Sequence, residues 1–511
     1  MSKDRGQLAL VLHSHMPYVE GFGTWPGGEE WLWEAWADCY ARLFDVIEGQ
    51  PVTLSLTPVL CDQFESLRGS AGDRMLRWVR EVREHLLEED IDGFTRVDCP
   101  GLAAEMRRQL AQYRASATRF EGELGRDLIA VCKRLASSGV ELWTSAYTHA
   151  IVPLLATDFG VDLQIGLGAQ SHRERFGEWS GGFWLPECAY RPGIEPQLAR
   201  NGVGYFCVDQ TNQLGLGSLD HLQPSVTESD LVALPIDWQT VSKIWAMDGY
   251  PVAAPYRSSF RRSMHSHMPW RNDGGDYDPR AARTQADAHA KEFVEAAAAR
   301  LDEFRQARGR PGLLTCAVDT ELLGHWWYEG PWFLQSVFEH AKHVGLVMTT
   351  AASALENAEP VPRMLGTSSW GKAKDLSTWD APSVQELAWR TRSAELQLHD
   401  LMAAIAAGAS QPDHQLNQET SEDTQNTVLR AARELLAMQS SDWAFQISND
   451  KADAYARGRF EGHAAHFAEL VTAVSQSSSA VQSPHTPVDP QLANLAPALN
   501  IDTLKRFLCG H

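Results

Sequence analysis

Glu187 is the residue of this sequence whose surroundings best suit nucleophilic chemistry. It lies in FWLPECAYRPG (183–193), directly after a proline that ends an apolar run, with Trp184 and Tyr190 close by and Arg191 next in line. The ionisation of a carboxylate in such a semi-apolar setting can be tuned by its neighbours, as a nucleophile requires. The alternative is a structural glutamate that pairs with Arg191.

Two further carboxylates, Asp319 and Glu321, lie two residues apart in AVDTELLGHWWYEG (317–330). Because side chains alternate along a strand, both would share one face if the strand persists. A separation of about 5–5.5 Å between Asp319 and Glu187 would suit a retaining glycosidase, whereas about 6.5–9.5 Å would indicate inversion. The tryptophans of GHWW favour a sugar site, because indole faces bury the apolar faces of sugars. The alternative makes Asp319 a helix cap and Glu321 a solvated loop charge.

Three histidines at the ends of apolar runs form a second candidate group. His13 and His15 belong to an HSH motif, and His149 lies in AYTHAIVP. They could bind a divalent metal, as in a metal-dependent carbohydrate deacetylase, or stay neutral and hold sugar hydroxyls. Since no spacing here is diagnostic of a metal site, we expect sugar contacts, no metal and no cofactor.

Several tryptophans stand in loop-like segments, where core packing cannot be assumed. Trp370 in GTSSWG and Trp379 in DLSTWD lie beside glycine or serine, which favours a place in a substrate cleft. The alternative is that they fasten a C-terminal domain to the barrel. The same two possibilities hold for Asp442 and Trp443 in QSSDWAF.

These groups must be positioned by an alternation of short apolar runs and helical stretches over the first 350 residues. The eight candidate strands are 7–12, 52–57, 140–146, 181–186, 203–208, 231–236, 313–318 and 345–350. In a parallel barrel, reactive side chains project from the carboxyl ends of the strands, so the residues after these runs would meet at one face. The pattern predicts an α/β fold with a TIM-like barrel.

Helical stretches interrupt and follow this alternation. Residues 62–139 are charged and helical, and after about residue 380 the strand signal disappears. The polar segment 410–426 is expected to be a mobile loop. The predicted domains are a catalytic barrel (1–61 and 140–380), a helical insertion (62–139), a helical C-terminal domain (381–474) and a flexible tail with a possible terminal helix (475–511).

The composition excludes several classes of protein. Among 511 residues, 45 Lys and Arg face 66 Asp and Glu, and the net charge of −21 lacks the positive field that nucleic-acid binding needs. No apolar run approaches the roughly 20 residues of a membrane span. The eight cysteines form no Cys-x-x-Cys pair, and LALVL (8–12) is too short for a signal-peptide core. We therefore expect a cytoplasmic protein with reduced thiols and with no nucleic-acid or membrane partner.

Several motifs together resemble glycoside hydrolase family 57, and within it the branching enzymes. The matching segments occur in order along nearly the whole chain: HSHMPY (13–18), AYTHA (146–150), WLPECAYRPG (184–193), YFCVD (205–209), VDTELLGHWW (318–327), SSWG (368–371) and RAARELLAMQSSDWAF (430–445). The last segment is more similar to the branching enzymes than to the amylases or glucanotransferases of the family.

The resemblance implies a distorted (β/α)7 TIM-like barrel with a helical insertion and an all-helical C-terminal domain, and a retaining mechanism without a metal. Since that barrel has seven strands, one of the eight candidates, 231–236 or 345–350, is expected to be wrong. By matched motif, Glu187 would be the nucleophile and Asp319 the general acid/base. The implied substrate-binding residues are His13, His15 and His149 at the cleaved bond and Trp270, Trp370, Trp379, Asp442 and Trp443 along the glucan.

The implied reaction is a double displacement in which an α-1,4-glucan is both donor and acceptor. Glu187 would attack the anomeric carbon of an internal α-1,4 linkage while Asp319 protonates the leaving oxygen. Asp319 would then deprotonate a 6-hydroxyl of the acceptor, which forms an α-1,6 branch. The alternatives are a 4-α-glucanotransferase or α-amylase of the same family, and a metal-dependent carbohydrate deacetylase that uses His13 and His15.

Overall fold

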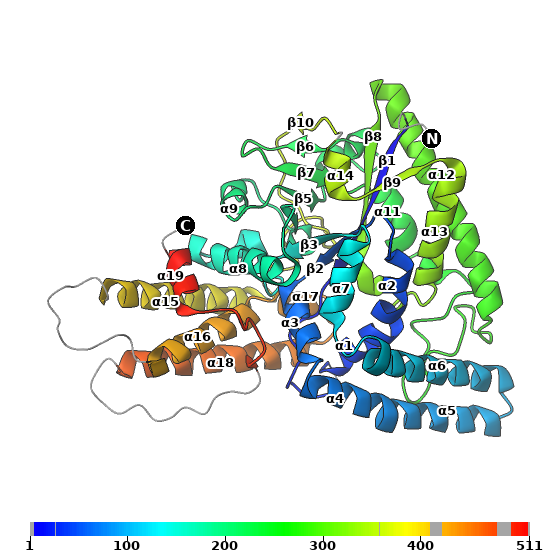
Figure 1. The fold of residues 1–511 in the computed structure, drawn as a ribbon, viewed down its shortest axis with the longest axis horizontal. Coiled ribbons are helices and arrows are strands. Elements are labelled where there is room, and N and C mark those ends of the chain that lie inside the picture. The colour runs from blue at the N-terminus through cyan, green and yellow to red at the C-terminus, as the bar shows by residue number, and fades with distance from the viewer. Residues whose placement is uncertain (1–4, 26, 357, 409–421, 478–491, 509–511) are drawn as a thin grey trace.

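A curled parallel sheet lies at the centre of the computed structural model, which describes residues 5–25, 27–356, 358–408, 422–477 and 492–508 (Figure 1). Seven strands follow one another in the spatial order β7-β5-β4-β3-β2-β1-β8, and every neighbouring pair is parallel. They are β1 (Gly6–Ser14), β2 (Thr53–Leu56), β3 (Glu141–Ser145), β4 (Gly182–Trp184), β5 (Tyr205–Val208), β7 (Val232–Pro235) and β8 (Gly312–Asp319).

The two edges of this sheet meet at one point. A single parallel bridge joins Ile236, just after β7, to Thr315 of β8, and the amide of Asp237 donates to the Thr315 carbonyl at 3.0 Å. The result is a distorted seven-stranded barrel, so the predicted fold class is confirmed.

All eight predicted strands form, but only seven of them belong to the barrel, as expected from the resemblance. Segment 231–236 becomes β7 of the barrel, whereas 345–350 contains β9 (Val347–Thr349), which pairs with β1 outside the seven-strand order. Two two-residue strands were not predicted. They are β6 (Ser225–Val226), antiparallel to β7, and β10 (Val361–Pro362), which pairs with β6.

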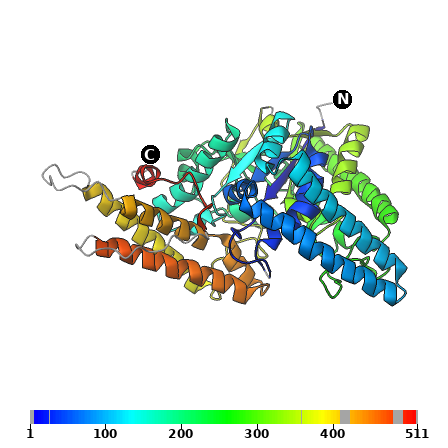
Figure 2. The same cartoon turned by 60° about the horizontal axis from the view of Figure 1, so that its bottom comes forward.

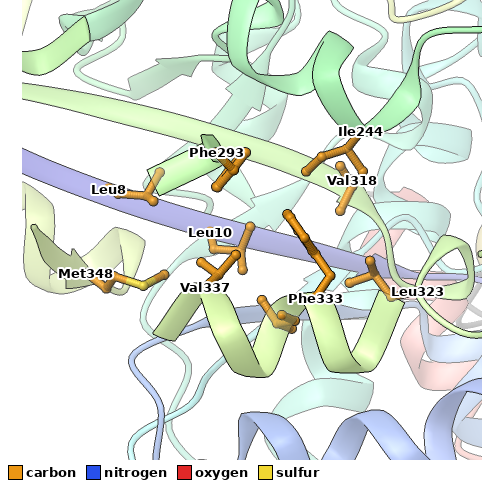
Figure 3. A pocket seen from close by; sticks show the side chains of 10 residues that line it. Leu8, Leu10, Ile244, Phe293, Val318, Leu323, Phe333, Val337 and Met348 are labelled. Atoms are coloured by element: carbon orange, nitrogen blue, oxygen red, sulfur yellow. The ribbon is translucent and has the colours of Figure 1, made fainter. Parts of the chain in front are cut away.

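The alternation of side chains in β1 and β8 determines which residues reach the interior of the barrel. Leu8, Leu10 and Val318 face outward (Figure 3). They are covered by Phe293 of helix α12 (Pro279–Arg308) and Phe333 of helix α13 (Gly330–Val344). The apolar void between them measures only about 10 Å³, no more than the roughly 10–15 Å³ that one water molecule needs. It is therefore a packing defect rather than a ligand pocket.

Helices cover the outside of the sheet and extend beyond it. In the first part of the chain they are α1 (Glu30–Glu34), α2 (Ala41–Ile47), α3 (Pro58–Ser66), α4 (Ser70–Arg77), α5 (Glu84–Arg96), α6 (Pro100–Thr118), α7 (Leu128–Ser137), α8 (Asp158–Phe176), α9 (Glu195–Arg200), α10 (Thr211–Leu214), α11 (Trp238–Trp245), α12 (Pro279–Arg308), α13 (Gly330–Val344) and α14 (Ala351–Leu355). Between β2 and β3, α5 and α6 pack along each other and project from one side of the barrel (Figures 1 and 2).

The C-terminal part of the described chain is helical. It contains α15 (Gln385–Gly408), α16 (Glu422–Met438), α17 (Ser441–Ser448), α18 (Asp453–Ser477) and α19 (Ile501–Leu508). The segments predicted to be a mobile loop (410–426) and the start of a flexible tail (from 475) lie largely outside the described residues, but the prediction is wrong for their described parts, because 422–426 belong to α16 and 475–477 to α18. Tyr18 and Tyr147 from the barrel share one hydrophobic core with Leu435, Trp443 and Phe460 from these helices. Because the two parts share this core, α17 is held in a fixed position against the barrel.

Among the residues that the structure describes, we find no helix with the length and apolar character that a membrane crossing requires.

Candidate active site

The carboxyl ends of four strands bring the predicted site residues to one end of the barrel. His13 on β1 lies opposite Asp319 at the end of β8 in the strand register. Both are on the inner face, because they alternate with the outward-facing Leu10 and Val318. His149 follows β3, and Glu187 follows β4 in a single 3₁₀ turn.

Glu187 adopts a backbone conformation that non-glycine residues rarely use, with φ 58° and ψ 22°. Such a conformation costs of order 1–3 kcal/mol and persists where the surrounding structure enforces it. Here Trp370 enforces it twice: its amide donates to the Glu187 carbonyl at 2.9 Å, and its indole Nε1 donates to Glu187 Oε2 at 2.8 Å. The carboxylate is thereby fixed in one orientation.

The ionisation of Glu187 and that of Asp319 are coupled. Burial, with the nearby charge of Asp319, raises the pKa of Glu187 from its ordinary 4.5 to about 8, although the Trp370 hydrogen bond acts the other way. Burial and the charge of Glu321 raise the pKa of Asp319 to about 8. Because each charge opposes the other, the two carboxyls titrate as a pair.

The surroundings of the two carboxyls decide which one loses its proton first. The indole N–H of Trp370 stabilises an ionised Glu187, whereas the charge of Glu321 opposes an ionised Asp319. This difference in hydrogen bonding and charge favours, in the singly ionised pair, a Glu187 carboxylate beside a protonated Asp319. This is the state in which a nucleophile and a general acid act together.

Glu321 is buried, so the alternative prediction that it is a solvated loop charge is wrong. The Tyr40 hydroxyl donates a hydrogen bond to its Oε1, and burial raises its pKa to about 7. The tyrosine therefore holds this third carboxyl beside Asp319.

The three predicted histidines form a stack. The His13 ring lies 4.5 Å from that of Trp184 and 4.9 Å from that of His149, and the rings of His149 and His15 are 4.0 Å apart. Burial, with the charge of neighbouring histidines, lowers the pKa values of His13 and His149 well below 6.5, so both are neutral. All six ring nitrogens have protein partners: Ser55 and His149 for His13, Thr57 and Asp442 for His15, and His13 and Ser441 for His149.

This geometry is that of hydrogen-bonding side chains rather than of metal ligands. Within the described ranges, no group of three histidine, cysteine, aspartate or glutamate side chains is arranged to hold a metal ion. The ring nitrogens are instead bonded to one another and to Ser55, Thr57, Ser441 and Asp442.

Of the tryptophans predicted to contact the glucan, Trp370 lies beside the catalytic carboxylate and Trp270 does not. Trp370 is half-buried beside Glu187, with its ring 4.9 Å from that of Trp184. The contacts of Trp270 are with Phe94 on α5 and with Arg261, rather than with the carboxylates or the histidines.

Trp379 and Trp443 are 3% and 2% exposed, so neither offers an open ring face on which a sugar could stack. Trp379 packs against Ile151 and Ala189. Trp443 donates from Nε1 to the Ala437 carbonyl at 2.8 Å. Both positions fit the alternative in which these residues fasten the C-terminal helices to the barrel, and stacking of a glucan on them is not supported here.

Sequence reasoning missed Ser441, which contacts His149, and Tyr40, which holds Glu321. Ser441 belongs to the quoted QSSDW segment, and its place before Asp442 at the start of a helix was the available signal. Tyr40 lies within a helical turn and carries no local signal of its contact, which spans 281 residues.

Two family models match this chain. The model of glycosyl hydrolase family 57 matches residues 9–365, and the model named 1,4-alpha-glucan branching enzyme, C-terminal, matches residues 399–484. The first match alone covers well over half of the chain.

Relatives and solved structures agree with these models. A protein described as "probable 1,4-alpha-glucan branching enzyme" from Mycobacterium tuberculosis is 31% identical over 500 residues, which is 92% of each chain. The crystal structure of a branching enzyme of this family from Pyrococcus horikoshii superposes with a TM-score of 0.89 at 26% identity, over 98% of this chain and 97% of that one. The Thermococcus kodakaraensis branching enzyme, solved in complex with glucose and additives, gives 0.86 at 26% identity over 98% and 96%.

Proposed function

The chain belongs to glycosyl hydrolase family 57, and from this premise we propose that it is a 1,4-α-glucan branching enzyme, a hexosyltransferase whose donor and acceptor are both α-1,4-glucans. It cleaves an internal α-1,4 linkage and transfers the released chain to a 6-hydroxyl. The match to a branching-enzyme C-terminal model and the named relatives support this activity.

The first displacement begins with Glu187 as nucleophile. Its ionised carboxylate, oriented by Trp370, attacks the anomeric carbon and forms a covalent glycosyl-enzyme. Asp319, which holds its proton because burial and the charge of Glu321 raise its pKa, protonates the leaving oxygen. The neutral ring of His149 lies beside Glu187, with both of its nitrogen atoms bonded within the protein, so it borders the reaction centre without adding charge.

The second displacement makes the branch. Asp319, now a base, deprotonates the 6-hydroxyl of an acceptor glucan, which attacks the anomeric carbon and releases Glu187. The configuration is retained because two inversions have occurred. Water must be kept from the same intermediate, and the close packing of Trp370, Trp184 and the histidine stack around Glu187 supports such exclusion.

The observation that carries this proposal is the unequal environment of the two carboxyls. Trp370 donates to Glu187, whereas a third carboxyl, Glu321, lies beside Asp319. Incubation of Asp319→Asn with a maltosyl fluoride donor tests it. Peptide mass spectrometry should then find the sugar on Glu187, and should find none in the double variant that also carries Glu187→Gln. Label on another residue would refute the assignment.

The proposal extends to the substrate, the location and the domains. A glucan of the amylose or glycogen type would place the enzyme in glycogen biosynthesis. The seven described cysteines are free and six of them are buried, which supports a reducing, cytoplasmic location. The division into barrel, helical insertion and helical C-terminal domain at residues 62, 139 and 380 is part of the same proposal.

A further inference from the structure

Helix α17 begins with two residues that each contact a different histidine of the stack. Ser441 Oγ lies 2.8 Å from His149 Nδ1, and Asp442 Oδ2 lies 2.9 Å from His15 Nε2. The backbone holds this corner in place: the amide of Ser441 donates to the His149 carbonyl at 3.2 Å, and Ala150 forms a bridge with Ser440. The C-terminal helices thus reach into the centre of the catalytic site.

The contact between His13 and His149 restricts where the protons can be. Their Nε2 atoms are 2.9 Å apart, so one must carry a hydrogen and the other must present a lone pair. Because both rings are neutral, each has only one N–H, and choosing the donor fixes both tautomers. His13 Nδ1 is bonded to Ser55, so the chain Ser55–His13–His149–Ser441 runs in one of only two directions.

The position of Glu187 distinguishes the two directions. Its Oε1 lies 4.0 Å from His149 Nδ1. With hydrogen on Nδ1, His149 turns a positive edge toward the ionised carboxylate, whereas the reverse direction would present a lone pair to it. The first direction is therefore favoured while Glu187 is ionised, with His13 donating to His149.

At 4.0 Å, however, Glu187 is too far away to accept a hydrogen bond from His149. The His149 ring is 3% exposed, so an Nδ1–H without an acceptor would be buried and unsatisfied. A donor in that state costs about 1–3 kcal/mol. Ser441 Oγ, at 2.8 Å, is the acceptor that removes this cost.

We propose that Ser441 is a positioning residue that holds His149 in the Nδ1–H form, so that the C-terminal helical region stabilises the ionised nucleophile Glu187. Asp442 fixes His15 in the same way, since its carboxylate accepts from His15 Nε2 while Thr57 lies at Nδ1. The inference rests on the proposed role of Glu187. The other titratable groups that act on Glu187 are Asp319, Asp442 and His15, and a substitution at Ser441 leaves all three in place.

The test compares Ser441→Ala with Ser441→Thr, which keeps the hydroxyl, and with Ser448→Ala on the same helix as a matched control. Ser448 bonds to the Thr378 carbonyl rather than to the stack. In Ser441→Ala the acidic limb of the pH profile of kcat/KM should move up by about one pH unit, and kcat/KM below that limb should fall about tenfold. Ser441→Thr should restore most of the position of the acidic limb and most of the lost kcat/KM. Ser448→Ala should change neither quantity.

A second readout does not depend on activity. Nitrogen-15 NMR of labelled histidines should show His149 protonated at Nδ1 in the wild type and shifted toward the Nε2 tautomer in Ser441→Ala. Should that variant unfold, the nearly isosteric Ser441→Cys takes its place. An unchanged acidic limb together with an unchanged tautomer would overturn the proposal. Activity that survives in Glu187→Gln would refute the proposed function instead, so the two failures are distinguishable.

Discussion

Replacing the nucleophile by its amide, Glu187→Gln, should stabilise the fold at alkaline pH. A pKa raised on folding means that the folded state holds the proton more tightly than the unfolded chain does. Ionisation of Glu187 therefore costs stability progressively as the pH rises from about 4.5 to about 8, and the full cost is present above that range. Glutamine has no charge to lose, so the variant escapes this cost.

The size of the effect follows from the same pKa. A rise from 4.5 to about 8, at about 1.4 kcal/mol for each pH unit, sets a ceiling of about 5 kcal/mol. The side chain is 18% exposed, and part of the rise belongs to its coupling with Asp319, so the realised gain is smaller. We expect about 1–3 kcal/mol at pH 8.5 and almost none at pH 4.5.

Urea unfolding at both pH values measures the gain, with Glu228→Gln at an exposed position as the control. Glutamine can still accept the Trp370 hydrogen bond, so packing should be preserved. A variant that is less stable than the wild type at pH 8.5, or whose gain is the same at pH 4.5, would refute the assignment of a strained, buried charge to Glu187.

Three further predictions concern the ionisation of the site. Trp370→Phe removes the indole donor, so the pKa of Glu187 should rise and the acidic limb of kcat/KM should move up by about one pH unit; an unmoved limb would contradict this role. Tyr40→Phe removes a hydrogen bond that favours ionised Glu321, so Glu321 is more often protonated and Asp319 loses its proton more easily. The basic limb of the pH profile of kcat/KM should therefore move down, and movement upward would contradict the coupling between Glu321 and Asp319. Asp319→Asn should still be glycosylated in a single turnover by a glycosyl fluoride, whose leaving group needs little protonation, while its activity on amylose falls by at least 10²-fold; equal losses on both donors would argue against a general acid.

Much of the barrel could be predicted because its strands are local patterns. A short apolar run is visible in sequence whether it lies in the middle of the sheet, like β3, or beside it, like β9. The runs do not say which partners they pair with, so the position of β9 outside the barrel had to come from the structure. Strands β6 and β10 have two residues each and leave no pattern to detect.

The residues of the site could be predicted from the sequence, but the hydrogen bonds and packing contacts between them could not. Glu187, Asp319 and the three histidines each lie at the end of a strand or shortly after one, and parallel strands bring such residues to one face. The contact between His15 and Asp442 joins residues 427 positions apart, and nothing in either segment encodes its partner. Burial of Trp443 likewise depends on helices packed around it rather than on its own neighbours in the chain.

The central claim is that this site branches α-1,4-glucans through Glu187, and proton NMR of amylose incubated with the enzyme tests it most directly. New α-1,6 anomeric signals are counted against new reducing ends, with Glu187→Gln as the control. Growth of the α-1,6 signal with few reducing ends, abolished in the variant, is the predicted result. Reducing ends or redistributed α-1,4 chains without α-1,6 linkages would contradict branching and would indicate an α-amylase or a 4-α-glucanotransferase.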